Sequence, residues 1–433
     1  TIAASHAFAT GRAYFGSING TTVATATVSF DRAMHPTLSF DRASHPLVDV
    51  HGAVAWIVVP RAPRVAFVGV RSAHMSGGGA IVSLPISKTG VLSPTPLSTT
   101  PFSPVHFAYE AAWLLACDYG DGYCSTFAVD DREGKVASMS SSVCNFTVPP
   151  PAPVNPNPRQ ASSHPHEANF APQKRSRRGG GAVGDADALT SLTAFVPDLG
   201  GDRVHFLSID RANGSIHLDA AKVRCSFLLF ARAFLPRVFC CLLTYSLLLC
   251  LSIRLDAAKS LVFARGAGPR HMVWSPDLAW AYVVCEIISA VAVFPYDAAR
   301  SEFASTTPAQ VISTLAPTHN ASEFTKAAEV AVSADGTLLF ASNRGNQSIA
   351  VFDVDSATGL LALRSLALGV AWPRDISVLG ASLLAIERDG GAAGRGAVGV
   401  FDIAPGPTGG GLVLPPRESH DVASPASYAY VAL

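Results

Sequence analysis

The sequence has few charged residues and no excess of either sign. Charged residues make up 15% of the 433 positions, and 32 Lys and Arg balance 32 Asp and Glu. Proteins that bind nucleic acid or an anionic membrane normally carry a basic patch or an excess of positive charge. We therefore expect no nucleic acid and no membrane as the main partner.

Cysteine is also scarce, with eight residues and no Cys-x-x-Cys pair. Disulfide frameworks are typical of short secreted chains that are richer in cysteine, and structural zinc sites need closely spaced ligands. We interpret Cys117, Cys124, Cys144 and Cys285 as small buried hydrophobic residues. We also see no basic segment followed by an apolar one, as in a signal peptide, and expect a cytoplasmic protein.

One alternating strand pattern occurs seven times. Its copies begin at Thr22, Ala80, Tyr123, Arg203, Ala290, Ser348 and Ala397. The last three read Ala-Val-Ala-Val-Phe, Ser-Ile-Ala-Val-Phe and Ala-Val-Gly-Val-Phe. Alternation of apolar and polar residues with a period of two indicates a half-buried strand.

A second motif, usually a proline followed by polar and then apolar residues, also occurs seven times. Its copies begin at His45, Ser103, His164, Gly268, Lys326, Trp372 and Ser424. Seven units of three to four antiparallel strands are typical of a β-propeller, in which stacked blades cover one another's faces. We predict an all-β, seven-bladed β-propeller over residues 1–433, whose C-terminal strand completes the first blade. A β-sandwich fits the count of seven poorly.

Two segments do not fit the repeat. Residues 146–191 are rich in proline, then basic, then rich in glycine, and we expect a disordered or irregular loop insertion there. Residues 223–259 include an uncharged run from 238 to 253, and Leu-Asp-Ala-Ala-Lys occurs at both 218–222 and 255–259. We interpret 223–259 as a retained intron or a duplication; a membrane anchor or a packed insertion helix is the alternative.

Polar residues recur where the first strand of a unit begins and the second ends, two points that lie side by side in an up-and-down blade. We expect one end of the axis to gather arginines, histidines and carboxylates. Arginine pairs bind carboxylate or phosphate, and His or Glu can move a proton. Solvated strand ends or salt bridges between blades are the alternative, and a metal site is a weaker one. The candidates are His106, His164, His166, Arg270, His271, Glu286, Glu329, Arg344, Arg374, Asp375 and Arg388.

Around these residues the chain resembles the seven-bladed propeller lactonases, which include 6-phosphogluconolactonases and the fungal 3-carboxy-cis,cis-muconate lactonizing enzyme. The resemblance rests on His164-Pro-His, Gly268-Pro-Arg-His, Tyr282-Val-Val-Cys-Glu, Ser342-Asn-Arg-Gly and Trp372-Pro-Arg-Asp. It implies a metal-independent and cofactor-independent hydrolase of an anionic sugar lactone, as in the pentose phosphate pathway. It also implies His166, Arg270, Glu286 and Arg344 as catalytic pocket residues.

Three hypotheses remain open. In the first, Arg270, Arg344 and Arg374 hold the anion of a lactone while His166 or Glu286 activates water. In this reading His164, His271, Glu329 and Arg388 also bind the substrate. The second is a muconate-type cycloisomerase that uses the same pocket, and the third is a propeller that only binds as a scaffold. The sequence does not indicate whether the protein is a monomer or an oligomer.

Overall fold

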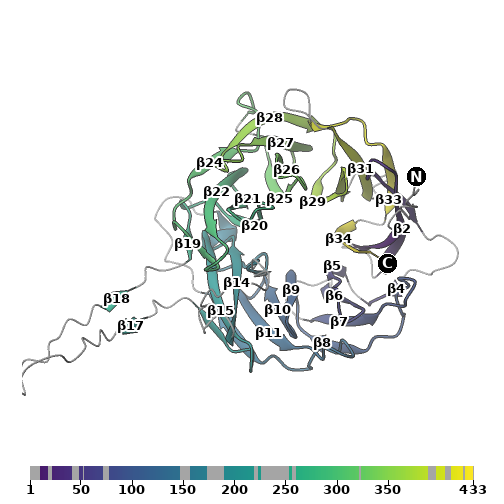
Figure 1. The fold of residues 1–433 in the computed structure, drawn as a ribbon, viewed down its shortest axis with the longest axis vertical. Coiled ribbons are helices and arrows are strands. Elements are labelled where there is room, and N and C mark those ends of the chain that lie inside the picture. The colour runs from purple at the N-terminus through teal and green to yellow at the C-terminus, as the bar shows by residue number, and fades with distance from the viewer. Residues whose placement is uncertain are drawn as a thin grey trace, which may run out of the picture.

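The computed structural model describes residues 10–17, 22–40, 48–51, 53–71, 78–146, 157–172, 190–218, 223–225, 253–255, 260–320, 323–388, 396–404, 411–422 and 425–432. Seven antiparallel sheets are arranged as blades in a ring around a central axis (Figure 1). This confirms the predicted all-β, seven-bladed propeller.

Each blade has four strand positions from the axis outward. Blade 1 contains β34 (Pro425–Ala432), β1 (Thr10–Ser17), β2 (Thr22–Phe30), β3 (Pro36–Phe40) and β4 (Val48–Asp49). Blade 2 contains β5 (Ala53–Val58), β6 (Val65–Arg71), β7 (Gly79–Pro85) and β8 (Ser98–Pro101). Blade 3 contains β9 (His106–Glu110), β10 (Trp113–Asp118), β11 (Tyr123–Ala128) and β12 (Ser142–Asn145).

The other four blades follow the same plan. Blade 4 contains β13 (Asn169–Phe170), β14 (Ser191–Asp198), β15 (Arg203–Asp210), β16 (Ile216–Leu218) and β19 (Leu261–Val262). Blade 5 contains β20 (Pro269–Trp274), β21 (Trp280–Cys285), β22 (Ala290–Asp297), β23 (Glu302–Phe303) and β24 (Gln310–Ser313). Blade 6 contains β25 (Lys326–Val332), β26 (Leu338–Arg344), β27 (Ser348–Val354) and β28 (Leu361–Leu368). Blade 7 contains β29 (Pro373–Leu379), β30 (Ser382–Glu387), β31 (Gly396–Ala404), β32 (Gly411–Leu412) and β33 (Glu418–Val422).

The repeated sequence patterns correspond to fixed positions within the blades. All seven copies of the alternating pattern form the third strand from the axis, as in β22, β27 and β31. Six copies of the second motif open an innermost strand. The copy at His45 is wrong, because its residues Val48 and Asp49 pair with β2 in blade 1 and β5 is the innermost strand of blade 2.

The ring is closed by strands from the two ends of the described chain. The C-terminal strand β34 pairs with β1 from Gly11↔Ala432 to Ser17↔Pro425 and becomes the innermost strand of blade 1 (Figure 1). This confirms the predicted completion of the first blade. Closure in this way removes an unpaired sheet edge at the axis.

The apolar residues of the described chain pack between blades. Seven hydrophobic clusters each join two neighbouring blades; one, for example, packs Phe15 and Val28 of blade 1 against Leu384 and Val400 of blade 7. Burial of these faces holds the blades together. The axis is therefore left for polar side chains.

The first predicted insertion is partly folded. Residues 147–156 and 173–189 lie outside the described residues, but 157–172 contain a 3-10 helix (Pro158–Gln160) and the innermost strand β13. Residues 157–172 are mostly irregular, as predicted, and they also supply this short helix and strand. The proline-rich and basic composition of the flanking residues conceals a short segment that blade 4 needs.

Most of the second insertion, 226–252 and 256–259, lies outside the described residues. Its described ends, β17 (Val223–Cys225) and β18 (Ile253–Leu255), pair with each other outside the ring (Figure 1). The chain leaves the blade after β16 and returns at β19, and both pair with β15 at the outer edge of blade 4. The ring is therefore continuous without this segment, and its origin as an intron or a duplication stays a prediction. No described helix has the length and apolar character needed to cross a membrane.

The cysteine prediction holds for two residues and fails for two. Cys144 and Cys285 are free and buried, whereas Cys117 and Cys124 form a disulfide between β10 and β11. The two residues lie directly opposite each other in the hairpin, with 4.0 Å between their Cα atoms. Such bridges are uncommon in cytosolic proteins, and the cytoplasmic location stays a prediction.

Candidate active site

β-Bulges at the axis explain how the innermost strands present charged residues. The register shifts between Pro269 and His271 in β20, and between Pro373 and Asp375 in β29, so that Arg270 and Arg374 are the extra residues. A third shift in β25 precedes Val330. A bulge changes the direction of side chains and is frequent beside functional sites.

Three arginines surround the carboxylate of Glu286, which follows β21 directly. Arg270 Nε lies 3.1 Å and Arg344 Nη2 3.0 Å from Glu286 Oε2, and Arg159 Nη1 lies 2.5 Å from Oε1. Glu286 and Arg270 are almost fully buried, with 1% and 2% exposure. Arg159 comes from the 3-10 helix and is more exposed, at 29% of its side chain. The ends of the second strands β21 and β26 and the start of the innermost strand β20 thus meet, and the 3-10 helix adds Arg159 from outside the repeat.

The ionisation of this group is set by the arginines. Burial alone would raise the pKa of Glu286, but Arg344, Arg270 and Arg159 outweigh it and lower that pKa to about 2. Burial and Arg270 also lower the pKa of Arg344 to about 10, against the attraction of Glu286. Glu286 is therefore ionised at neutral pH and is a poor proton acceptor.

Positive charge exceeds the negative charge that remains ionised. Half-buried Arg374 is repelled by Arg270 and Arg344, and burial with this repulsion lowers its pKa to about 9. Burial and Arg159 also lower the pKa of Lys326, which pairs with Arg344 in the strand register. Burial raises the pKa of Glu167 and of Asp375 well above its usual range and so disfavours negative charge on both beside the arginines. The site is consequently electropositive.

A chain of two histidines and a carboxyl lies behind the arginines. His166 Nδ1 is hydrogen-bonded to His271 Nε2 at 3.1 Å, and His271 Nδ1 lies 2.5 Å from Glu329 Oε2. Glu329 Oε2 also lies 3.9 Å from Arg270 Nη1. His166, His271 and Glu329 come from three consecutive blades, and each is less than 8% exposed. We call them the histidine chain.

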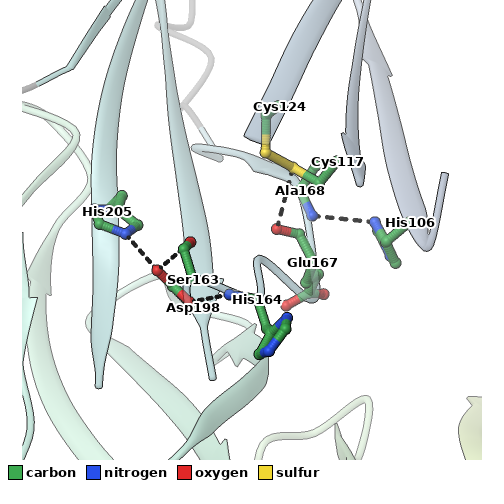
Figure 2. Close-up of a disulfide and its surroundings, with 9 residues drawn as sticks. All are labelled: His106, Cys117, Cys124, Ser163, His164, Glu167, Ala168, Asp198 and His205. Carbon is green, nitrogen blue, oxygen red and sulfur yellow. Dashed lines mark hydrogen bonds and ion pairs between the residues drawn. A yellow bond between two sulfur atoms is a disulfide. The ribbon is translucent and has the colours of Figure 1, made fainter. Parts of the chain in front are cut away.

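The segment that carries His166 is fixed at both ends (Figure 2). Before it, the Asp198 carboxylate accepts hydrogen bonds from Ser163 Oγ and the His164 backbone N–H, both at 2.7 Å, and contacts His205 Nε2 at 3.0 Å. After it, the Ala168 backbone N–H donates to His106 Nδ1 at 3.1 Å. These bonds place His166 firmly at the axis.

The loop after β14 joins two other parts of the site. Asp202 Oδ1 accepts from Gly268 N at 2.8 Å, just before β20, and from Gln160 Nε2 at 2.7 Å, beside Arg159. A Cβ atom at Gly200 in this loop would lie 1.8 Å from the Ser162 carbonyl oxygen, so the close approach requires glycine. Through the hydrogen bonds of Asp202, the segment Asp198–Asp202 therefore connects the 3-10 helix that carries Arg159 to the strand that presents Arg270.

Comparison with known proteins agrees with this architecture. A family described as "Lactonase, 7-bladed beta-propeller" matches residues 27–177 and 249–394, which is more than half of the chain. The chain belongs to the seven-bladed β-propeller lactonase family. The match includes Arg159, Arg270, Arg344 and Arg374, which we call the arginine cluster, and the histidine chain. It omits residues 178–248, which hold most of the 223–259 insertion.

Named relatives of this lactonase-family chain match only a part of it. A Bacillus subtilis 6-phosphogluconolactonase is 34% identical over 114 residues, which are 26% of this chain and 31% of the relative. One from Pectobacterium atrosepticum is 33% identical over 114 residues, 26% of this chain and 32% of the relative. The chain thus matches about a third of the length of these relatives.

Two solved structures share the whole fold at low identity. The Pseudomonas aeruginosa periplasmic gluconolactonase has a TM-score of 0.71 at 20% identity and covers 98% of this chain and 99% of its own. A Bacteroides fragilis putative 6-phosphogluconolactonase has a TM-score of 0.68 at 18% identity, with 99% of both chains covered. At this identity the likeness supports the fold.

Seven of the nine predicted site residues of this lactonase-family chain come together, namely His166, Arg270, His271, Glu286, Glu329, Arg344 and Arg374. The other two lie at the edge. The His164 ring stacks on Tyr119, and Arg388 lies over the ring of Trp372 at 4.9 Å. Among the described residues no group of three or more His, Cys, Asp or Glu is placed to hold a metal ion.

Sequence reasoning missed Arg159, whose partner is Tyr119. The Tyr119 hydroxyl lies 3.1 Å from Arg159 Nε and 3.0 Å from Nη2, and this contact directs the guanidinium toward Glu286. Arg159 lies outside the repeat pattern, in the segment that its composition marks as a loop. The one sequence signal for Arg159 was the Pro158-Arg159 pair itself, in a stretch that shows no repeat.

A groove of about 970 Å³ borders the arginine cluster between blades 5 and 6. Its lining includes Asn157, Ile287, Phe324 and Lys326. Ile287 follows Glu286 in sequence, and Lys326 pairs with Arg344. Of the cations described above, Lys326 is the one that lines the groove.

Proposed function

We propose that this chain hydrolyses an anionic sugar lactone of the 6-phosphogluconolactone type, without a metal ion. The observation that carries the proposal is the charge imbalance of the site. Four arginines and Lys326 meet one carboxylate, Glu286, that is held ionised. Electropositive, partly buried clusters bind phosphate and carboxylate strongly because guanidinium groups donate paired hydrogen bonds.

The more exposed cations are placed to bind the anion of the substrate. Arg159 and Arg374 are partly exposed, whereas Arg270 is almost fully buried and also donates to the Ala328 carbonyl oxygen. Arg270 therefore orients Glu286. Arg344 also contacts Glu286, and it donates a hydrogen bond to the Ala327 carbonyl oxygen. An oxyanion that develops at the lactone carbonyl is stabilised by the same positive field.

His166 is the general base in this proposal. Glu286 is unsuitable because its pKa is about 2. Burial and Arg270 lower the pKa of His166 well below its usual range, so its ring is neutral and carries a free lone pair. Since His271 engages Nδ1, Nε2 is the nitrogen that takes a proton from water as the water oxygen attacks the carbonyl. The ester C–O bond then breaks, and the proton held at His166 Nε2 passes to the ring oxygen, which leaves as a hydroxyl group. The new carboxylic acid loses its own proton to solvent.

The test measures the opening of 6-phosphogluconolactone by the full chain above the spontaneous rate. We expect Arg344→Met to lower kcat/KM by roughly 10²–10³-fold, as loss of one preorganised charge donor does. Arg364→Met is the matched control. Arg364 lies on β28, the outermost strand of the same blade, and pairs with Asp353 of β27. Cyclisation of carboxymuconate is measured in parallel. Spontaneous rates with both substrates would favour a propeller that binds only.

A further inference from the structure

The histidine chain has a direction that its free nitrogen defines. His166 uses Nδ1 toward His271 Nε2, and His271 uses Nδ1 toward Glu329 Oε2. If Glu329 is ionised, His271 carries its proton on Nδ1, accepts at Nε2, and so places the His166 proton on Nδ1. His166 Nε2 is then the lone pair at one end, and the Glu329 carboxylate is the acceptor at the other.

Both rings lie where a positive charge is unfavourable. Burial, followed by repulsion from Arg270, lowers the pKa of His166 and of His271 well below its usual range. Arg374 and Arg344 act on both rings in the same direction. A proton accepted by His166 therefore cannot be kept on an imidazolium without a large electrostatic penalty.

Glu329 is the carboxyl of this region that changes its ionisation near neutral pH. Burial raises its pKa to about 7, against the lowering by Arg270, Arg374 and Arg344. Burial, followed by repulsion from Glu329, raises the pKa of Glu167 and of Asp375 well above its usual range. Of the three, Glu329 is the one in contact with a histidine ring nitrogen.

We propose that His271 and Glu329 form a proton relay behind His166, so that the proton taken from the attacking water ends on Glu329. The relay rests on the proposed hydrolysis. One proton enters at His166 Nε2, the Nδ1 proton of His166 moves to His271 Nε2, and the Nδ1 proton of His271 moves to Glu329. Both rings end neutral in the other tautomer, and Glu329 ends as the carboxylic acid. Glu329 and His271 are positioning and proton-accepting residues that do not touch the substrate.

Wild-type protein alone provides the first test. The rate is measured in mixtures of H₂O and D₂O and plotted against the deuterium fraction. Because a relay moves more than one proton in the rate-limiting step, the points should fall below the straight line that joins the rates in pure H₂O and pure D₂O. The pH profile of kcat/KM should rise with pH through about 7, since Glu329 must be ionised to accept the proton. A straight plot in an active enzyme would overturn the relay.

Glu329→Gln provides the second test. Gln keeps a side-chain oxygen that can face His271 Nδ1 but takes up no proton, so His166 must become an imidazolium. We expect kcat/KM to fall roughly 10²–10⁴-fold, the plot to become straight, and the rise in the pH profile to move below pH 7. Glu329→Asp should recover part of the rate and the curvature. An unchanged pH profile in Glu329→Gln would contradict the proposal.

Glu167→Gln is the matched control. Glu167 is a second buried carboxyl beside Glu329, but it accepts from the Met272 backbone N–H at 2.7 Å, and burial raises its pKa well above its usual range. We expect it to keep the curved plot and the rise near pH 7. Its loss of both would assign the effect to the packing of the region and would overturn the relay.

Nitrogen NMR of histidine-labelled protein separates the relay from the lactonase activity. As the pH falls through about 7, His166 and His271 should change from the Nδ1–H to the Nε2–H tautomer while both remain neutral. Fixed tautomers, or an imidazolium signal, would overturn the relay even in an active enzyme. The expected switch in a protein that opens no lactone would instead overturn the proposed function.

Discussion

The two parts of the ring differ in what they place at the axis, although their backbones repeat. In blades 4–7 the starts of the innermost strands and the end of β26 present Arg270, Arg344, Arg374 and the histidine chain, and the 3-10 helix adds Arg159. At the corresponding places blades 1–3 present Tyr428, Trp56 and His106, and the last two rings contact at 4.1 Å between their centroids. One repeated strand geometry thus supplies the positions, and the residue at each position decides whether that arc is charged or aromatic.

The two arcs meet at His271. The Trp56 ring lies 5.8 Å and the His106 ring 5.6 Å from the His271 ring, both edge to face. The aromatic rings on one side keep water away from the histidine chain, which strengthens the electrostatic effect of the arginines on the other side. The charged arc should therefore dominate activity, and the aromatic arc should act through packing.

The largest effect is expected for Arg270→Met. Arg270 is a fully buried partner of Glu286, and its loss leaves a buried carboxylate with one counter-ion fewer. We expect lactone opening to fall to the spontaneous rate and the free energy of unfolding to drop by about 3–5 kcal/mol. Activity assays with urea unfolding check this. A variant with near wild-type activity would contradict the assignment of chemistry to the charged arc.

Acid should destabilise the protein through Glu286. Its pKa is about 2 in the folded chain, below the ordinary 4.5, so its stabilising contribution is present above pH 4.5 and is lost as pH falls toward 2. The shift corresponds to about 3 kcal/mol. Urea unfolding at pH 2–6 measures it, with Glu286→Gln expected to flatten the slope. Equal slopes in the two proteins would show that the charged arc does not govern acid stability.

A smaller effect is expected for Arg159→Met. Because Arg159 is partly exposed and bonds Glu286 from outside the repeat, its loss removes substrate binding more than chemistry. KM should rise about 10–30-fold with kcat within about threefold, as for the loss of a charged hydrogen bond. Steady-state kinetics with 6-phosphogluconolactone decide this. A fall in kcat alone would place Arg159 in the chemical step.

The smallest effect is expected in the aromatic arc. Trp56→Phe keeps an aromatic ring against His106, and we expect kcat/KM within about threefold and a loss of stability of about 1 kcal/mol. A loss of activity comparable to that of Arg270→Met would mean that the two arcs do not divide the work as proposed.

The repeat made most of the fold predictable. Seven alternating segments located the third strand of every blade, because a half-buried strand leaves a period of two in the sequence. The motif at His45 failed, since the residues that follow it, Val48 and Asp49, pair with β2 in blade 1. The Cys117–Cys124 bridge was missed because its residues face each other only once the β10–β11 register is known.

The site was predictable in part. Residues at the starts of innermost strands and the ends of second strands could be grouped before any coordinates, and Arg270, Glu286 and Arg344 do meet. The bulges that direct Arg270 and Arg374 leave no clear sequence pattern, and Arg159 comes from a segment with no repeat. The order of His166, His271 and Glu329 depends on distances that strand periodicity does not contain.

The most direct test of the electropositive site compares a phosphorylated lactone with its uncharged counterpart. The full chain is assayed with 6-phosphogluconolactone and with gluconolactone at low salt, and spontaneous opening is subtracted from each rate. We expect kcat/KM to be at least about 100-fold higher for the phosphorylated substrate, corresponding to about 2.7 kcal/mol, and to lose most of this preference in Arg344→Met. Equal kcat/KM for the two lactones would contradict a site built to bind an anion.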